Sequence, residues 1–314
     1  MKKRLLILLA IIDLVLIGSY LIISRSKKIT YTITNSFPPA KSIFKEFIKE
    51  PTPIEEQIIL IATGDVMLGR AINYKSVKDN NFTWMWGKTS DTLRAADVVF
   101  INLESPLVNN CPLTTGGMIF CADTKNIAGL TFAGIDIANL ANNHINNYGQ
   151  EGIKTTTELL NNAGIVPIGL GVPVYKSLKN IKFAFLGYNQ FNRLPDINQE
   201  IQQAKSRADI VVIAFHWGEE YTDKPTKKQQ ELAHLTIDSG ADLVIGHHPH
   251  WIQPIEVYRD KLIVYSLGNF IFDQSWSEKT KLGEIGKFTF TKNGLTDYLL
   301  MPIKIDNSGQ PNFK

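Results

Sequence analysis

The chain has 314 residues, 44% of them hydrophobic, which is enough for one large domain or two small ones. Its formal net charge of +3 is unevenly distributed: residues 1–50 hold nine Lys/Arg and three Asp/Glu, so the remainder holds 24 basic and 27 acidic residues. Nucleic-acid binding relies on clustered cations that neutralise phosphates. The slightly acidic body therefore argues against a nucleic-acid partner, and the basic excess belongs to the N-terminal end.

The N-terminal segment has the composition of a membrane helix. Residues 5–24 are mostly apolar, and as a helix they are long enough to cross a hydrocarbon core of roughly 30 Å. A cleavable signal peptide is the alternative, but the stretch ends in Leu-Ile-Ile-Ser, which suits the peptidase poorly. We predict a cytoplasmic stub at residues 1–4, a single-pass signal anchor with a transmembrane helix at residues 5–24, and a proline-containing stalk or linker at residues 25–56.

From residue 57 onward, predicted strands and helices alternate. Amphipathic patterns predict helices at residues 89–95, 149–163, 199–207 and 226–239. Apolar runs predict strands at residues 166–168, 182–186, 210–215, 242–245, 253–257 and 262–266. Residues 287–291 and 296–305 flank an Asn-Gly turn and predict an antiparallel hairpin. We expect one α/β domain at residues 57–314, a layered sandwich of mixed parallel and antiparallel sheets flanked by helices.

Several predicted strands end in side chains that can bind a metal. They lie within residues 58–65, 98–104, 136–144, 210–216 and 242–250. Each segment is apolar and β-branched at first and then ends in Asp, Glu, Asn or His. Buried parallel strands emerge at the carboxyl edge of a sheet, where ligands gather. A polar residue that merely ends a strand explains any single case, but the repetition predicts a metal site at this edge.

Carboxylates combined with neutral imidazoles suit a divalent cation, because the carboxylates offset its charge and the imidazoles leave it a good Lewis acid. The candidate ligands are Asp65, Glu104, Asn143, His216, His248 and His250. They are enough for one or two cations, and counting ligands does not separate the two cases. We expect His248-Pro249-His250 to adopt an extended backbone, so that both imidazole rings point to one cluster of ligands. We place His247 beside the ligand set, and His234 falls within a helical pattern as a surface or packing residue.

Other residues near these strand ends are candidates for different roles. Substrate binding is predicted for Arg70, Asn142, Glu219 and Asn269, although exposed loops explain them almost as well. Cys111 and Cys121 lie in one predicted loop and have no second Cys/His pair at zinc spacing. Outside the cytoplasm they could form a disulfide, with two unrelated thiols as the alternative.

Seven stretches of the chain resemble, in the same order, the CapA family of bacterial poly-γ-glutamate capsule synthesis proteins. They read GDVMLGR (64–70), NLESP (102–106), LANNH (140–144), YGQEG (148–152), HWGEEY (216–221), GHHPH (246–250) and YSLGNF (265–270). Together they cover roughly residues 58–273. The resemblance implies a fold like that of calcineurin-type metallophosphoesterases, with the domain on the outer side of the cell membrane.

The wider metallophosphoesterase pattern implies roles for single residues. Asp65 resembles its first aspartate, and Glu104 stands where a bridging aspartate is expected. Asn143-His144 resembles a pair in which the asparagine binds metal and the histidine is catalytic, donating a proton to the leaving group. The remaining ligands would be His216, His248 and His250. The implied cofactor is one or two divalent ions of the Mn, Fe or Zn type.

The chain departs from that pattern at one position. The superfamily usually has a histidine two residues after the first aspartate, where this chain has Met67. Thioether sulfur is a poor ligand for a hard divalent cation. The departure predicts a site that holds one metal weakly, or one whose chemistry has changed.

Two main functions follow. The resemblance implies a membrane-anchored, extracytoplasmic accessory of capsule or anionic polymer synthesis, which binds the polymer or a partner synthase complex without turnover. The alternative is a metal-dependent phosphoesterase acting on an envelope metabolite or a phosphodiester-linked glycan, with His144 as the proton donor. We rank the family role first and leave enzymatic activity open. A structural or adhesive ectodomain is a third hypothesis, and it predicts no metal.

Overall fold

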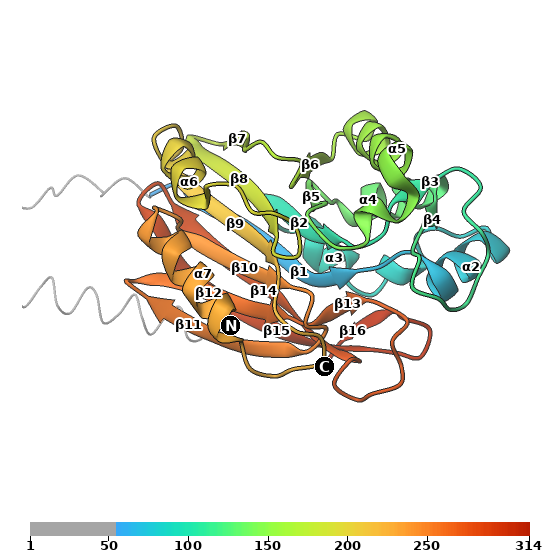
Figure 1. Cartoon of the computed structure of the whole chain (residues 1–314). Coiled ribbons are helices and arrows are strands. Elements are labelled where there is room, and N and C mark those ends of the chain that lie inside the picture. The colour runs from blue at the N-terminus through green and yellow to red at the C-terminus, as the bar shows by residue number, and fades with distance from the viewer. Residues whose placement is uncertain (1–54) are drawn as a thin grey trace, which may run out of the picture. The chain divides into compact units, whose positions relative to one another are not determined.

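Two β-sheets packed face to face form the centre of the structure (Figure 1). The computed structural model describes residues 55–314, which cluster into one unit. The predicted cytoplasmic stub, the predicted transmembrane helix and nearly all of the predicted stalk lie outside the described residues. Within residues 55–314, none of the helices combines the length and the apolar character needed to span a membrane.

The first sheet has the strand order β16, β15, β14, β1, β2, β5, β6, and β13 pairs with the end of β1. The bounds are β1 Ile58–Val66, β2 Val98–Leu103, β5 Ile137–Asn139, β6 Val166–Ile168, β13 Asn269–Ile271, β14 Leu282–Thr291, β15 Gly294–Ile305 and β16 Pro311–Phe313. Strands β1, β2, β5 and β6 run parallel. The antiparallel pair β14 and β15 forms the predicted C-terminal hairpin.

The second sheet has the order β11, β12, β10, β9, β8, β7. Its bounds are β7 Val174–Leu178, β8 Ile181–Asn189, β9 Ile210–His216, β10 Leu243–His247, β11 Ile252–Tyr258 and β12 Lys261–Leu267. The four central strands run parallel, and β7 and β11 are antiparallel edges. A separate short pair joins β3 Leu107–Val108 to β4 Ala122–Asp123. The prediction of mixed sheets is thus confirmed.

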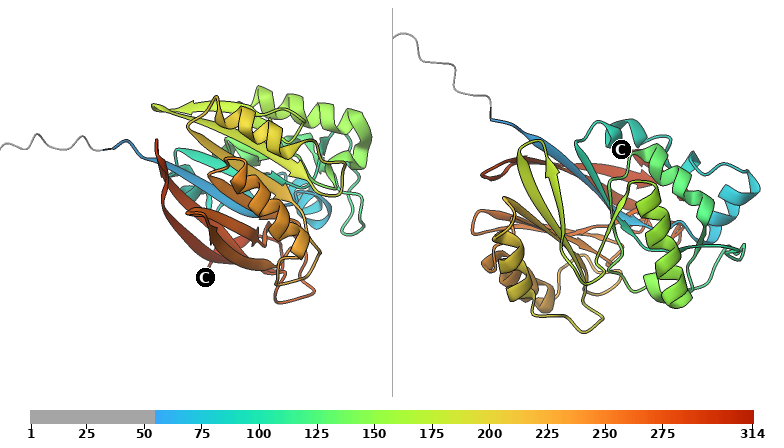
Figure 2. Two further views of the ribbon diagram at one scale, coloured as in Figure 1. Left: turned by 60° about the vertical axis from the view of Figure 1, so that its left-hand side comes forward. Right: turned by 90° about the horizontal axis from the view of Figure 1, so that it is seen from above.

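Helices cover the outer face of each sheet, and Figure 2 shows the two helical layers on opposite sides of the sandwich. The first sheet is covered by α2 Arg70–Lys78, α3 Ser90–Arg94, α4 Ile127–Ala133 and α5 Gly149–Asn162, with the 3-10 turns η1 Trp84–Trp86, η2 Thr124–Asn126 and η3 Ile145–Tyr148. The second is covered by α6 Ile197–Lys205 and α7 Lys227–Asp238. The order of layers is helix, sheet, sheet, helix.

The central strands are apolar along their whole length because both of their faces are buried. In β2, Val99 and Ile101 pack into the helical layer, whereas Val98 and Phe100 pack between the two sheets. Successive side chains of a strand point to opposite faces, so a strand covered on both sides needs apolar residues at every position. This burial leaves only the strand ends for polar side chains, and it brings those ends to one edge.

The patterns locate four helices to within about two residues and miss α2 and α4. Helix α4 contains Gly129, a poor helix former, which hides the helical pattern. A Cβ atom there would lie 2.2 Å from the Phe82 carbonyl oxygen and 2.8 Å from the Trp86 indole nitrogen. Close packing against η1 therefore requires glycine at a position where a helix propensity scale disfavours it.

Candidate metal centre

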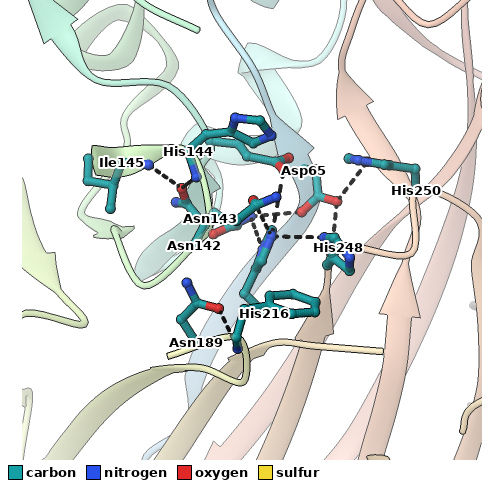
Figure 3. Close-up of polar contacts among 12 residues, drawn as sticks. Asp65, Asn142, Asn143, His144, Ile145, Asn189, His216, His248 and His250 are labelled. Carbon is teal, nitrogen blue, oxygen red and sulfur yellow. Dashed lines mark hydrogen bonds and ion pairs between the residues drawn. The ribbon is translucent and has the colours of Figure 1, made fainter. Parts of the chain in front are cut away.

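Strands of both sheets bring the predicted ligands to one place (Figure 3). The residues are Asp65 near the end of β1, Glu104 after β2, Asn143 after β5, His216 at the end of β9, and His248 and His250 after β10. All except Asn143 are buried. The carboxyl ends of the parallel strands are the shared feature, as expected for ligands in open α/β sheets.

His216 lies at the middle of one group of ligand atoms. Its Nε2 atom lies 2.9 Å from Asn143 Oδ1, 3.1 Å from His248 Nδ1 and 3.7 Å from Glu104 Oε1. These contacts join strands of different sheets, since Glu104 and Asn143 belong to the first and His216 and His248 to the second. A group of carboxylate, amide and imidazole ligand atoms such as this one suits a divalent cation of the first transition row.

His250 and Asp65 form the second group. His250 Nδ1 lies 3.3 Å from Asp65 Oδ2 and 2.9 Å from Asn269 Oδ1. The Asn269 amide nitrogen donates to Gln274 Oε1 and to the Thr280 carbonyl oxygen, so its Oδ1 faces His250 as an acceptor. The Nδ1–H group of His250 is therefore held by oxygen acceptors, which leaves Nε2 as the nitrogen for a metal.

Glu104 belongs to both groups. Potential ligand atoms of Glu104, His216 and His248 lie within 4.8 Å of one another, and so do those of Asp65, Glu104 and His250. Glu104 is fully buried, and neither of its carboxylate oxygens has a hydrogen-bond partner among the described residues. A buried carboxylate without a partner is costly unless a cation or proton compensates it. The donor set therefore fits a divalent metal centre in which Glu104 is shared.

The electrostatics of the cluster agree with this fit. Burial would raise the pKa of Asp65, but His247 and His250 hold it well below the usual range. Burial and the charge of Asp65 raise the pKa of Glu104 well above normal. Burial and the adjacent His250 lower the pKa of His248 to about 3. Burial alone would lower the pKa of His250, but Glu104 and Asp65 raise it to about 9. A bound cation would take the place of protons here.

The backbone around the histidine pair differs from the expected extended strand. His248 has φ of 97° and His250 has φ of 58°, so both adopt left-handed conformations. Pro249 limits the residue before it, but the turn is tight on both sides of the proline. Left-handed φ at non-glycine residues costs of order 1–3 kcal/mol each and is concentrated at functional sites. The expectation of extended backbone was wrong, although both rings still face the cluster.

A ladder of amides across three strands supports Asp65, and the sequence patterns did not single it out. The Asn102 amide nitrogen donates to Asp65 Oδ1 over 2.8 Å, and Asn102 Oδ1 accepts from Asn139 over 3.0 Å. Asn139 Oδ1 in turn accepts from the Ala141 backbone N–H, which defines the direction of every amide in the chain of hydrogen bonds. Asp65, Asn102 and Asn139 are paired neighbours on β1, β2 and β5.

His144 lies beside the ligand cluster on the loop after β5. Its ring stacks on Phe120 with centroids 3.9 Å apart, and its Nδ1 lies 3.1 Å from Asn147 Oδ1. The Phe120 backbone N–H also donates to that Oδ1, which identifies the amide oxygen. Cys121, next to Phe120, forms a disulfide with Cys111. Burial lowers the pKa of His144, so the ring is neutral at pH 7.

Met67 does not join the ligand cluster. Its side chain packs in a small apolar group with Phe120 and Phe272, and its sulfur accepts the Gly69 backbone N–H at 3.0 Å. Apolar packing and a backbone contact therefore account for the Met67 side chain.

The four residues predicted to bind substrate have different surroundings. Arg70 pairs with Asp273 and lies over the Phe120 ring. The Asn142 amide is fully paired, because it accepts from two backbone N–H groups of its own loop and donates to the Leu103 carbonyl oxygen at the end of β2. Asn269 orients His250, as described above. Glu219 is exposed.

The remaining histidines lie outside the ligand groups. His247 is buried, and neither of its ring nitrogens has a partner among the described residues. It lies between the sheets near Phe100. His234 is on α7, where its Nε2 lies 2.8 Å from Glu256 Oε1 and its ring stacks on Tyr258.

Comparisons with known proteins identify the family. The family model described as bacterial capsule synthesis protein PGA_cap matches residues 59–274. Capsule biosynthesis protein CapA of Bacillus anthracis is 31% identical over 287 residues, covering 82% of this chain and 69% of the relative. PGA biosynthesis protein CapA of Bacillus subtilis (strain 168) is 30% identical over 268 residues, covering 77% and 70%. The resemblance inferred from the motifs is confirmed.

Solved structures agree on the fold. A hypothetical protein from Thermus thermophilus superposes with a TM-score of 0.55 at 15% identity, covering 79% of this chain and 99% of that one. A phosphatase from Mycoplasma pneumoniae superposes with a TM-score of 0.53 at 14% identity, covering 80% and 95%. At this level of identity the similarity establishes a metallophosphoesterase-like fold and nothing more.

Proposed function

We propose, from the premise that this chain belongs to the bacterial capsule synthesis protein family, that it is a metal-binding accessory of anionic polymer synthesis. The polymer would be of the poly-γ-glutamate type, because one relative is named a PGA biosynthesis protein. In this proposal the centre binds the polymer or a partner synthase complex at the surface of the cell membrane.

The strongest support for the metal centre comes from the surroundings of Glu104. It is a buried carboxylate with no hydrogen-bond partner among the described residues, and it stands between two sets of ligand atoms. Asp65 and His250 would hold one side of a bound ion, and His216, His248 and Asn143 the other. When bound, a divalent cation supplies Lewis-acid polarisation of an oxygen ligand.

A phosphoesterase activity is the second candidate, and the position of His144 favours it. This neutral imidazole is next to Asn143, and Phe120 and Asn147 hold its ring in one orientation. Because Asn147 Oδ1 accepts from Nδ1–H, Nε2 of the neutral ring is free to accept a proton, and the ring donates one to a leaving group only after Nε2 has been protonated. The chain thus has a proton-transfer group where a phosphoester would bind.

The proposed location is the outer face of the cell membrane, with residues 5–24 as the anchor. The support is the apolar character of this segment and the basic residues that flank it. In fractionated cells, the full chain is expected in the membrane pellet after a high-salt wash. Recovery of the full chain in the soluble fraction would contradict the anchor.

Metal analysis paired with hydrolysis of bis-p-nitrophenyl phosphate tests the function. The purified full chain is expected to contain about one or two divalent ions, and His250→Ala is expected to lose most of them because it removes a ligand from the shared group. His234→Ala is the matched control, since His234 lies on α7 against Glu256.

The outcomes separate the candidates. Metal without hydrolysis supports the accessory, and metal with hydrolysis that disappears in His144→Ala supports the phosphoesterase. Equal metal content in His250→Ala and the parent would refute the ligand assignment. A parent chain without metal under conditions that supply Mn, Fe and Zn would leave the structural ectodomain as the better explanation.

A further inference from the structure

A cavity of about 510 Å³ lies next to the candidate metal centre. It is bounded by the loop after β6 at residues 169–172, by the segment between β8 and α6, and by the start of α5. A volume of this size is typical of pockets for small ligands or short segments of a polymer.

The cavity and the metal centre share a wall. Asn143 lines the cavity, and its Oδ1 lies 2.9 Å from Nε2 of the candidate ligand His216. Asn189 also lines the cavity, and on the paired strands β8 and β9 it is the register partner of His216. A ligand that reaches the centre at Asn143 can therefore extend directly into the cavity.

The lining offers amides and aliphatic surface. The carboxamide side chains are Asn142, Asn143, Asn146, Gln150, Asn189 and Asn192, and the aliphatic ones include Ile153, Leu170, Leu186 and Leu194. Asn189 is only 7% exposed, its Oδ1 accepts from the Phe191 backbone N–H, and its amide nitrogen has no hydrogen-bond partner among the described residues. This amide nitrogen lies at the cavity surface, where it can donate to an acceptor that a ligand supplies.

The lining has one basic and one acidic side chain, and the basic one, the exposed Arg193, is available to an anionic group. The charged lining residues are Arg193 and Glu200. Glu200 accepts the Tyr188 hydroxyl at 2.8 Å, whereas Arg193 has no carboxylate partner anywhere in residues 55–314. Guanidinium groups bind carboxylates through paired, charge-assisted hydrogen bonds.

We propose that this cavity binds a short peptide-like chain that carries a carboxylate, with the carboxylate at Arg193 and a chain carbonyl at the Asn189 amide nitrogen. Amide groups of such a chain pair with the carboxamides, and its methylene groups contact the aliphatic wall. A sugar ring fits less well, because the single aromatic lining residue, Tyr188, is 5% exposed and offers little face for stacking. The inference deepens the proposed function and rests on it.

Isothermal titration of the purified full chain tests the proposal with three probes: N-acetyl-triglutamate, N-acetyl-triglutamine with an amidated C-terminus, which carries no carboxylate, and an N-acetylglucosamine trimer. The acidic peptide is expected to bind, the glutamine peptide more weakly, and the sugar trimer least. Arg193→Ala is expected to weaken acidic peptide binding about tenfold or more, since it removes the charge-assisted contact. Arg207→Ala is the matched control, because Arg207 is an exposed arginine that does not line the cavity.

Equal affinity of Arg193→Ala and the parent for the acidic peptide would overturn the proposal, as would no peptide binding at all or tighter binding of the sugar trimer. Each titration is run on metal-free and on metal-loaded protein. Peptide binding to a chain that takes up no metal would support the proposed ligand of the cavity and would refute the metal centre. Metal uptake without peptide binding would do the reverse.

Discussion

Two carboxylates at the centre of this molecule have contrasting surroundings. Asp65 accepts from the Asn102 side chain and from the His248 backbone N–H at 3.1 Å, whereas Glu104 accepts from none of the described residues. Both are fully buried. Hydrogen bonds to the charged form stabilise a buried carboxylate, and their absence raises its pKa. Glu104 is therefore the carboxylate whose burial a bound cation would compensate.

Asn102 is expected to control how well the centre holds metal. Replacing it with alanine removes the donor to Asp65 and leaves Asn139 without its acceptor, so Asn102→Ala should weaken metal affinity about 10–100-fold. The measurement is a competition titration with a chelating dye. Asn126→Ala is the matched control, because Asn126 is another buried amide but bonds to Asn73 and not to the ligand cluster. Comparable losses in both variants would show that general destabilisation, not ligand orientation, is responsible.

At the scale of elements, the loop between β3 and β4 connects the disulfide to the centre. Cys111 and Cys121 close this loop, and Phe120 at its end stacks on His144. The loop also exposes Leu113, Met118 and Ile119. A loop that buries little apolar surface is held in one conformation mainly at its ends. The disulfide therefore holds Phe120 in the position where its ring stacks on His144.

Removing this disulfide is expected to lower stability by about 2–3 kcal/mol, from the entropy of closing a loop with a sequence separation of 10. The change is the double substitution Cys111→Ser and Cys121→Ser, followed by urea denaturation. Reductant should destabilise the parent by a similar amount and leave the double variant unchanged. A parent chain that is insensitive to reductant would mean that the disulfide does not contribute to the folded state.

At the scale of the whole molecule, the candidate centre joins the two sheets. Asp65, Glu104 and Asn143 come from the first sheet, and His216, His248 and His250 come from the second. Between the sheets the contact is largely apolar, with Phe100, Phe183 and Phe288 among the buried side chains. Apolar contacts are not directional, so ligands at one edge add a directional link to this interface.

Chelation should therefore lower thermal stability. A ligand that binds only the folded chain stabilises it by about 2.7 kcal/mol at 100 times its dissociation constant, and for a domain of this size that corresponds to a rise in Tm of roughly 5–10 °C. Melting the full chain with metal and with EDTA measures the difference. His250→Ala should show a much smaller difference than His234→Ala. An identical Tm with and without metal in the parent would argue against a bound ion in the folded state.

Much of the candidate site was predictable from the sequence because each ligand lies at the end of an apolar strand or shortly after it. A run such as residues 210–215 has to be buried on both faces, and its following His216 then has to emerge at the sheet edge. This local rule identified Asp65, Glu104, His216 and the histidines after β10 without any knowledge of which strands are neighbours. The family was inferred separately, from the resemblance of motifs that contain the same residues, and the family model confirms it.

Tertiary structure alone decided which groups support these ligands and how the strand order brings them together. Asn102 and Asn139 sit inside strands, where their polarity has no local explanation; only the pairing of β1, β2 and β5 makes them neighbours of Asp65. Asn269 and His250 likewise meet across a loop, and the amide-lined cavity exists only because the end of β8 lies beside the loops that follow β5 and β6. Side-chain patterns along one strand determine burial, but contacts between strands depend on register and order, which a single strand does not encode.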